Sequence, residues 1–65
     1  MKRLNLWMRK NRISQSELAR RLEVTQPSVW AWCHGVKQPT AANLIALRKE
    51  TGLSVDELLG QRRAA

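Results

Sequence analysis

Residues 15–32 read QSELARRLEVTQPSVWAW and contain two short helical patterns separated by only three residues, 23–25. A link this short forces a sharp corner between two helices. Apolar side chains recur on one face of each pattern, which predicts that the two helices pack against a common core. These apolar positions are Leu18, Ala19, Leu22, Val29 and Trp32.

Capping residues predict where these two helices and three others begin and end. Two Ser-x-x-Glu pairs have the spacing of the capping box, in which each side chain bonds to a backbone N–H of the other residue. Two threonines are further N-cap candidates, and three glycines follow apolar stretches, where a left-handed C-terminal cap is expected. The candidates are Ser14 with Glu17, Ser54 with Glu57, Thr25, Thr40, Gly35, Gly52 and Gly60.

The predicted fold class is all-α, a compact five-helix domain over residues 1–60, with residues 61–65 as a short basic tail. Phe and Tyr are absent and β-branched residues never alternate, so strands are not expected. The predicted helices are Arg3–Lys10, Gln15–Leu22, Gln26–Cys33, Ala41–Thr51 and Val55–Leu59. The predicted core adds Leu4, Trp7, Met8, Leu44, Ile45, Leu47, Val55, Leu58 and Leu59, with Trp7 and Trp32 as its largest members.

Size and charge narrow the class of function. A chain of 65 residues forms one domain and buries only roughly 60% of its unfolded surface, which leaves no room for a large enzyme cleft. Twelve Lys and Arg against five Asp and Glu give a net charge of +7, which favours a polyanionic partner. The single cysteine, Cys33, allows no internal disulfide, and no apolar run is long enough to span a membrane; a cytoplasmic protein is expected.

The order of these residues resembles the lambda-repressor/Cro-like family of helix-turn-helix regulators, also known for XRE-type repressors. Residues 15–32 follow the family pattern of Gln, Leu-Ala, a turn ending in Val-Thr, Gln and a later Val. Gly35, Pro39, Leu44, Leu47 and the stretch LSVDELL at 53–59 continue it, so the resemblance covers residues 4–59. It implies a helix-turn-helix made by the second and third helices. The short chain is more similar to a Cro-type phage regulator than to a full-length repressor.

Two positions depart from the family pattern. Glu23 stands where the turn usually has glycine, and a positive φ there would cost about 1–2 kcal/mol. Met8 and Cys33 stand where the family often pairs an Arg with a Glu. Because both replacements are apolar, no charge is stranded, and Cys33 is interpreted as a packing residue. One Cys and one His do not make a zinc site.

The helix at 26–33 is predicted to lie in the DNA major groove. Helical spacing places Pro27, Trp30, Ala31 and His34 opposite the buried Val29 and Trp32, with Gln26 at the side of the first turn. The resemblance implies base reading by Gln26, Pro27, Ser28, Trp30 and Ala31. Gln26 suits an adenine edge, and Pro27 and Ala31 suit a thymine methyl. For Trp30, partial packing or a dimer contact remains the alternative to DNA contact.

Positive charge is absent from this helix, since residues 26–33 contain no Arg or Lys. The commonest specific contact, Arg with guanine, is therefore missing from it, and a preference for A·T pairs is expected. Phosphate contacts are predicted from the start of the second helix and from the loop after the third. The candidates are Gln15, Lys37, Gln38, His34 and Arg12, followed by Arg9, Lys10, Arg20 and Arg21.

Binding as a homodimer to a palindromic operator is expected, because one helix reads few base pairs and half-sites lie ~34 Å apart. Leu53, Val55, Leu58 and Leu59 are the candidate dimer surface, with membership of the core as the alternative. The predicted function is transcriptional repression at the nucleoid, without cofactor, metal or small-molecule ligand. A protein-interaction module such as an antitoxin is the main rival; a membrane-active peptide and an enzyme fit the pattern less well.

Overall fold

The computed structural model describes residues 1–60, and within them the chain is helical without strands. The five helices are α1 (Lys2–Asn11), α2 (Gln15–Leu22), α3 (Gln26–Cys33), α4 (Ala41–Thr51) and α5 (Val55–Leu59). The predicted bounds of α2 to α5 are confirmed, and α1 is one residue longer at each end. The tail predicted at 61–65 lies outside the described residues.

Hydroxyl side chains begin four of the helices, as the sequence predicts. Each accepts a hydrogen bond from the backbone N–H three residues further on, which satisfies one of the unpaired donors of the first turn. The capping box at α5 is complete, because the Glu57 side chain also accepts from the backbone N–H of Ser54. The four caps are Ser14, Thr25, Thr40 and Ser54.

The capping box predicted at α2 is only half formed. Ser14 accepts from the N–H of Glu17 at 3.1 Å, but the Glu17 carboxylate bonds to Arg20 and Arg21 on the next turn. A charge-assisted bond to a guanidinium is stronger than one to a neutral N–H. The sequence pattern therefore located the start of α2 correctly but not the partner of Glu17.

A left-handed residue closes most of the helices. Gly52 and Gly60 cap α4 and α5 as predicted. The end of α3 differs slightly, because His34 is the cap and Gly35, at φ 71°, is the residue after it. The end of α2 is closed by Glu23, at φ 57° and ψ 41°. The sequence predicted a strain at Glu23 only if its φ were positive, and this φ is positive.

The corner between α2 and α3 is a Schellman motif, in which two backbone bonds run back into the helix that has ended. The N–H of Glu23 donates to the carbonyl of Arg20 at 3.3 Å, and the N–H of Val24 donates to that of Ala19 at 3.0 Å. The Val24 side chain then packs against the core. Thr25 caps α3 directly after Val24, so the corner contains no residue beyond Glu23, Val24 and Thr25.

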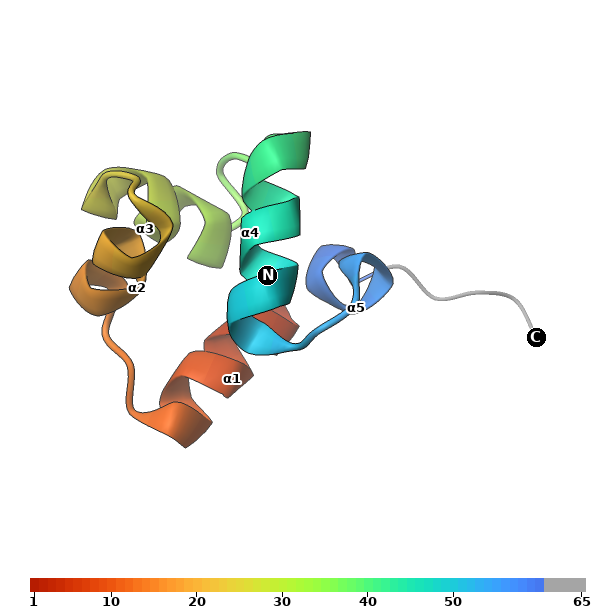
Figure 1. Cartoon of the computed structure of the whole chain (residues 1–65), viewed down its shortest axis with the longest axis horizontal. Helices are drawn as coiled ribbons and strands as arrows, with labels where there is room; N and C mark the ends of the chain where they lie inside the picture. Colours follow the sequence, from red (N-terminus) through yellow and green to blue (C-terminus); the bar gives the residue numbers. More distant parts are fainter. Residues whose placement is uncertain (61–65) are drawn as a thin grey trace.

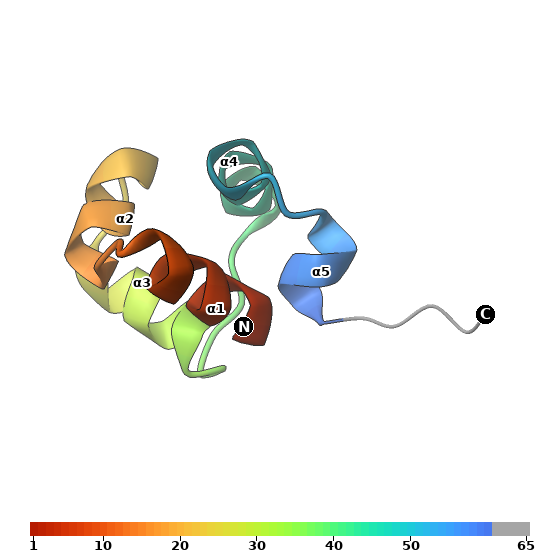
Figure 2. The ribbon, with the colours of Figure 1, turned by 90° about the horizontal axis from the view of Figure 1, so that it is seen from below.

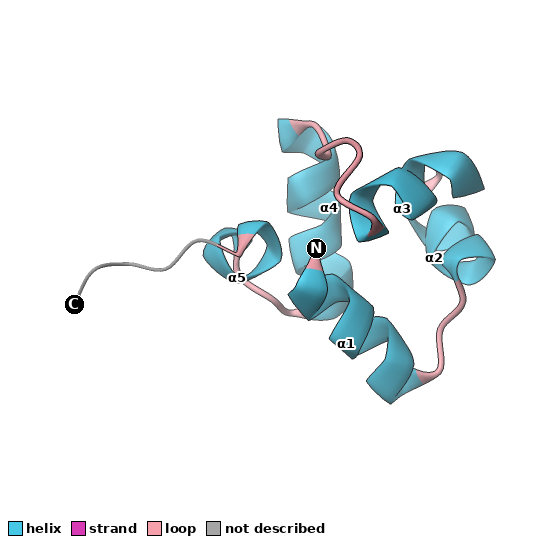
Figure 3. Ribbon diagram, turned by 180° about the vertical axis from the view of Figure 1, so that it is seen from behind, coloured by secondary structure: helices cyan, strands magenta, loops and turns pink. Residues whose placement is uncertain are grey.

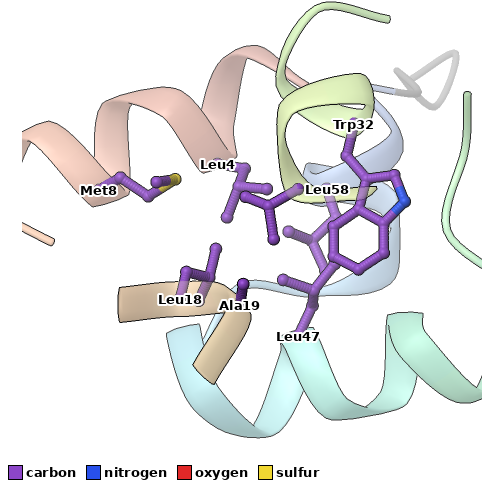
Figure 4. Close-up of a cluster of buried hydrophobic side chains, with 8 residues drawn as sticks. Leu4, Met8, Leu18, Ala19, Trp32, Leu47 and Leu58 are labelled. Atoms are coloured by element: carbon purple, nitrogen blue, oxygen red, sulfur yellow. The ribbon is translucent and has the colours of Figure 1, made fainter. Parts of the chain in front are cut away.

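All five helices contribute to one core, which Figure 4 shows in close-up. Trp32 is 3% exposed and is its only aromatic member, whereas Trp7 packs against the edge and is only partly buried. Ile45, predicted as core, is 49% exposed, because it lies about 200° around the helix from Leu47, which is fully buried. The buried cluster consists of Leu4, Met8, Leu18, Ala19, Val29, Trp32, Leu47 and Leu58.

The helices are arranged so that α2 and α3 lie together at one end of the molecule and α5 lies at the other (Figure 1). Seen from below, α1 passes close to α3 (Figure 2), and the view from behind shows the loop that leads from α3 to α4 (Figure 3). The Asn5 side chain donates to the carbonyl of Cys33 at 3.1 Å. This bond satisfies a carbonyl that the end of a helix leaves unpaired, and ties α1 to the C-terminal end of α3.

Glu23→Gly is expected to stabilise the protein by about 1 kcal/mol. An L-residue in the left-handed region costs about 1–2 kcal/mol, and the greater freedom of glycine in the unfolded chain cancels part of the gain. Urea unfolding followed by circular dichroism measures the change. Glu23→Ala is the matched control and should shift stability by less than about 0.5 kcal/mol. Equal stabilities of the two variants would mean that residue 23 is not left-handed in solution.

Candidate nucleic-acid interface

The first turn of α3 is exposed and its polar groups are ordered. Gln26 and Pro27 are exposed and Ser28 is half-buried. The Thr25 hydroxyl accepts from the N–H of Ser28 and lies 2.9 Å from the Ser28 hydroxyl. Pro27 costs the helix no hydrogen bond, because N–H groups in the first turn have no partner within the helix. The turn therefore offers an amide, a ring and a hydroxyl to solvent.

A contact across the corner involves a residue that the sequence did not single out. The hydroxyl of Ser16, on α2, donates to Oε1 of Gln26 at 3.0 Å. Both side chains are exposed, so the bond lies on the surface of the helix pair. Nothing in the spacing of residues 16 and 26 signals this contact, because it depends on how the two helices cross.

Trp30 lies on the outer face of α3, as predicted, and is 47% exposed. Its ring stacks on that of His34, with centroids 4.1 Å apart and planes 22° from parallel. Nδ1 of His34 is 2.9 Å from the carbonyl oxygen of Trp30. Since a carbonyl oxygen can only accept, Nδ1 carries the proton of this bond. The two rings form one exposed aromatic surface along α3.

The predicted position of Ala31 on the outer face of α3 is wrong. Ala31 was expected there with Trp30, but it is only 8% exposed. The chain after α3 folds back, and the N–H groups of Val36 and Lys37 both donate to the Ala31 carbonyl, at 2.9 and 3.4 Å. Helical spacing within residues 26–33 does not reveal these bonds from the chain that follows the helix. Ala31 is therefore removed from the candidate base-reading set.

The predicted phosphate contacts lie on several elements. Gln15 is half-buried at the first position of α2, and Arg12 is exposed at the end of α1. Lys37 and Gln38 are exposed in the loop after α3, next to the exposed His34. Arg12 and Gln15 flank the link between α1 and α2, whereas His34, Lys37 and Gln38 follow α3, so none of the five lies within α3.

Two of the weaker phosphate candidates are engaged within the protein. Arg20 and Arg21 both pair with Glu17, and Arg21 also pairs with Glu50 of α4 at 3.0 Å. Hydrogen bonds from the two arginines lower the pKa of the Glu17 carboxyl. Arg9, Lys10, Arg12 and Lys37 have no ion pair among residues 1–60. Among the predicted phosphate contacts, the cations available for an external anion are therefore Arg9, Lys10, Arg12 and Lys37.

Cys33 is a packing residue, as the sequence indicates. Its Sγ lies 3.9 Å from Sδ of Met8, so the two residues that depart from the family's ion pair contact each other. Burial raises the pKa of the Cys33 thiol, against the opposing effect of the positive N-terminal amine. The thiol is therefore a poor nucleophile. The described part of the chain holds no cluster of three or more His, Cys, Asp or Glu side chains suited to a metal ion.

The predicted dimer surface needs a correction at Leu58, which is 1% exposed and belongs to the core. Its side chain points inward from α5 because the helix buries one face against α1 and α4. Leu53 packs against the core and is partly buried, while Val55 and Leu59 are half-buried. Only the last two leave apolar surface on α5 itself.

The family model described as helix-turn-helix matches residues 5–58 of the chain. The chain belongs to the helix-turn-helix family. The match is to its XRE, lambda-repressor-like branch, and it confirms over residues 5–58 the resemblance that the sequence placed at residues 4–59. No curated protein and no solved structure matches the chain, so the assignment rests on the family model and the fold.

Membership of the helix-turn-helix family implies a DNA-binding transcription regulator that binds double-stranded DNA. It is a family of regulators rather than of enzymes. Among the described residues, no helix of this helix-turn-helix protein is long and apolar enough to cross a membrane.

Proposed function

We propose that this protein is a sequence-specific regulator that binds a palindromic operator as a homodimer, with α3 of each copy in the major groove. Repression is the simplest outcome, because occupying a promoter requires only binding. The observation that carries the proposal is the exposed first turn of α3, where Gln26 and Ser28 are held by Ser16 and Thr25. Groups ordered before binding lose less entropy when they meet a base edge.

The base-reading set in this proposal is Gln26, Pro27, Ser28 and Trp30. The Gln26 amide can accept from adenine N6 and donate to N7, and Pro27 can contact a thymine methyl. The Trp30 indole adds an apolar surface, and its N–H can donate to an acceptor in the groove. With no Arg or Lys at residues 26–33, this set favours A·T pairs.

Affinity in this proposal comes mainly from phosphate contacts. Gln15 stands at the start of α2, where backbone N–H groups and the helix dipole favour an anion. Lys37, Gln38 and His34 follow α3, and Arg12 precedes α2, so contacts on both sides of α3 would fix its register. The net charge of +7 predicts that binding weakens steeply with salt.

A two-fold axis near α5 is the proposed dimer geometry. Because α5 lies at the opposite end of the molecule from α3, this axis would hold the two recognition helices apart (Figure 1). Two successive major-groove sites on one face of DNA require a separation of ~34 Å. Val55 and Leu59 would supply the apolar contact, with Leu53 behind them.

Selection from a random DNA library at two salt concentrations tests sequence reading. The expected result is an enriched palindrome with half-sites one helical turn apart and A·T pairs opposite α3. Gln26→Ala should relax the preference at one position of each half-site by about tenfold, within the range of a bidentate amide–base contact. Lys37→Ala is the matched control and should weaken all sequences alike.

Two outcomes of the selection would contradict the proposal. Salt-sensitive binding with no enriched sequence would leave only non-specific attraction. A protein-interaction module would then explain the fold better than a sequence-specific regulator. The second outcome is that guanines dominate the positions opposite α3, which would contradict base reading by Gln26, Pro27, Ser28 and Trp30.

Leu59→Asp is expected to weaken cooperative binding to the palindrome by about tenfold or more, since one buried apolar anchor at an interface is typically worth this much. Binding to a single half-site should stay unchanged. Gel-shift titrations on the two DNA lengths measure both quantities. Ile45→Asp, on the exposed face of α4, is the control. A larger loss of cooperativity from Ile45→Asp than from Leu59→Asp would move the dimer surface to α4.

A further inference from the structure

The His34 ring is tied at one nitrogen and open at the other. Nδ1 lies 2.9 Å from the carbonyl oxygen of Trp30, which can only accept, so Nδ1 carries a proton and donates. His34 is exposed, and its Nε2 has no hydrogen-bond partner within residues 1–60. A neutral imidazole has one donor and one acceptor nitrogen. Nε2 of the neutral ring therefore presents only a lone pair to solvent.

A lone pair on Nε2 cannot bond to a DNA phosphate, because phosphate oxygens are themselves acceptors. A ring protonated on both nitrogens carries a positive charge and makes a charge-assisted bond to such an oxygen. We propose that His34 contacts a backbone phosphate of DNA only as the imidazolium, so that DNA binding takes up a proton. The inference rests on the proposed function, because it assigns the protonation state of one phosphate contact beside α3.

The structure accommodates the added proton without rearrangement. The bond from Nδ1 to the Trp30 carbonyl is made by both forms of the ring. The ring also stacks on the Trp30 indole with centroids 4.1 Å apart, and a cation over the face of an indole is attracted by it. His34 is the C-cap of α3, and the C-terminal end of a helix favours positive charge.

The charged groups around this end of α3 suit an anion. The loop after α3 carries Lys37, and the start of α1 brings Lys2 and the Met1 amine, which donates to the Trp32 carbonyl at 3.0 Å. Lys2, Lys37 and Trp32 line one pocket. Among residues 1–60, His34 makes no ion pair with an acidic side chain. The other charged side chains on α1 and α2, the helices packed against α3, are Arg3, Arg9, Lys10, Glu17, Arg20 and Arg21.

A base contact is the alternative role for His34. The lone pair of the neutral ring could accept from the amino group of adenine or cytosine in the major groove. The N-terminal turn of a recognition helix approaches the base edges, however, and His34 stands at the opposite end of α3. The two roles predict opposite effects of pH, since protonation creates the phosphate contact and destroys the base contact.

The test measures affinity for the selected palindrome between about pH 8 and about pH 6, the range in which a histidine changes charge. His34 is the only histidine of the chain. Wild-type affinity should rise toward the lower pH by about tenfold for each half-site, the factor expected for one hydrogen bond to a charged group. His34→Gln, which cannot take up the proton, should show no such rise and should match the wild type at the higher pH.

His34→Arg is the complementary variant, because its charge is permanent. It should bind at both pH values about as tightly as the wild type does at the lower one. The salt dependence gives an independent readout, since each phosphate neutralised adds about 0.9 to the slope of log affinity against log salt. The wild-type slope should steepen by this amount for each half-site at the lower pH, and the slopes of both variants should stay constant.

Three results would overturn the inference. These are a wild-type affinity that falls toward the lower pH, a rise that persists in His34→Gln, and ring ¹⁵N shifts that place the proton of the free neutral ring on Nε2. The proposed function fails separately, if the wild type enriches no sequence at either pH. An enriched palindrome that the wild type binds equally at both pH values would defeat only the role of His34.

Discussion

The tight corner at residues 23–25 is the constraint on which the rest of the site depends. Two backbone bonds close the end of α2, the left-handed Glu23 turns the chain, and Thr25 caps α3 immediately afterwards. Val24 contributes its side chain to the core at the same point. Because no further residue separates the two helices, the corner fixes how α2 and α3 cross. This crossing brings the Ser16 hydroxyl within hydrogen-bond distance of the Gln26 side chain.

The core determines which face of α3 is available. Val29 and Trp32 are buried, and Asn5 ties the C-terminal end of α3 to α1. The N-terminal turn and Trp30 are left facing outward, so the helix is held at one end and along one side. The side chains that anchor α3 in the core are therefore not those that the proposed function assigns to DNA.

Sequence reasoning located the helices well because their ends are set by local chemistry. A hydroxyl three residues before its N–H partner, or a glycine after an apolar stretch, is visible in the chain itself. It failed where a contact depends on a distant segment. Ala31 is buried where the chain after α3 bonds back to its carbonyl, and Leu58 is buried where α5 packs on α1 and α4. The bond from Ser16 to Gln26 belongs to the same class.

The central claim is that the first turn of α3 enters the groove. An NMR titration of the isotopically labelled protein with the selected palindrome tests it most directly, by following backbone amide shifts and the Trp30 indole N–H. The account predicts the largest shifts at the starts of α2 and α3 and at Trp30, with small shifts on the exposed face of α4. Large shifts on α4 with the start of α3 unchanged would contradict it.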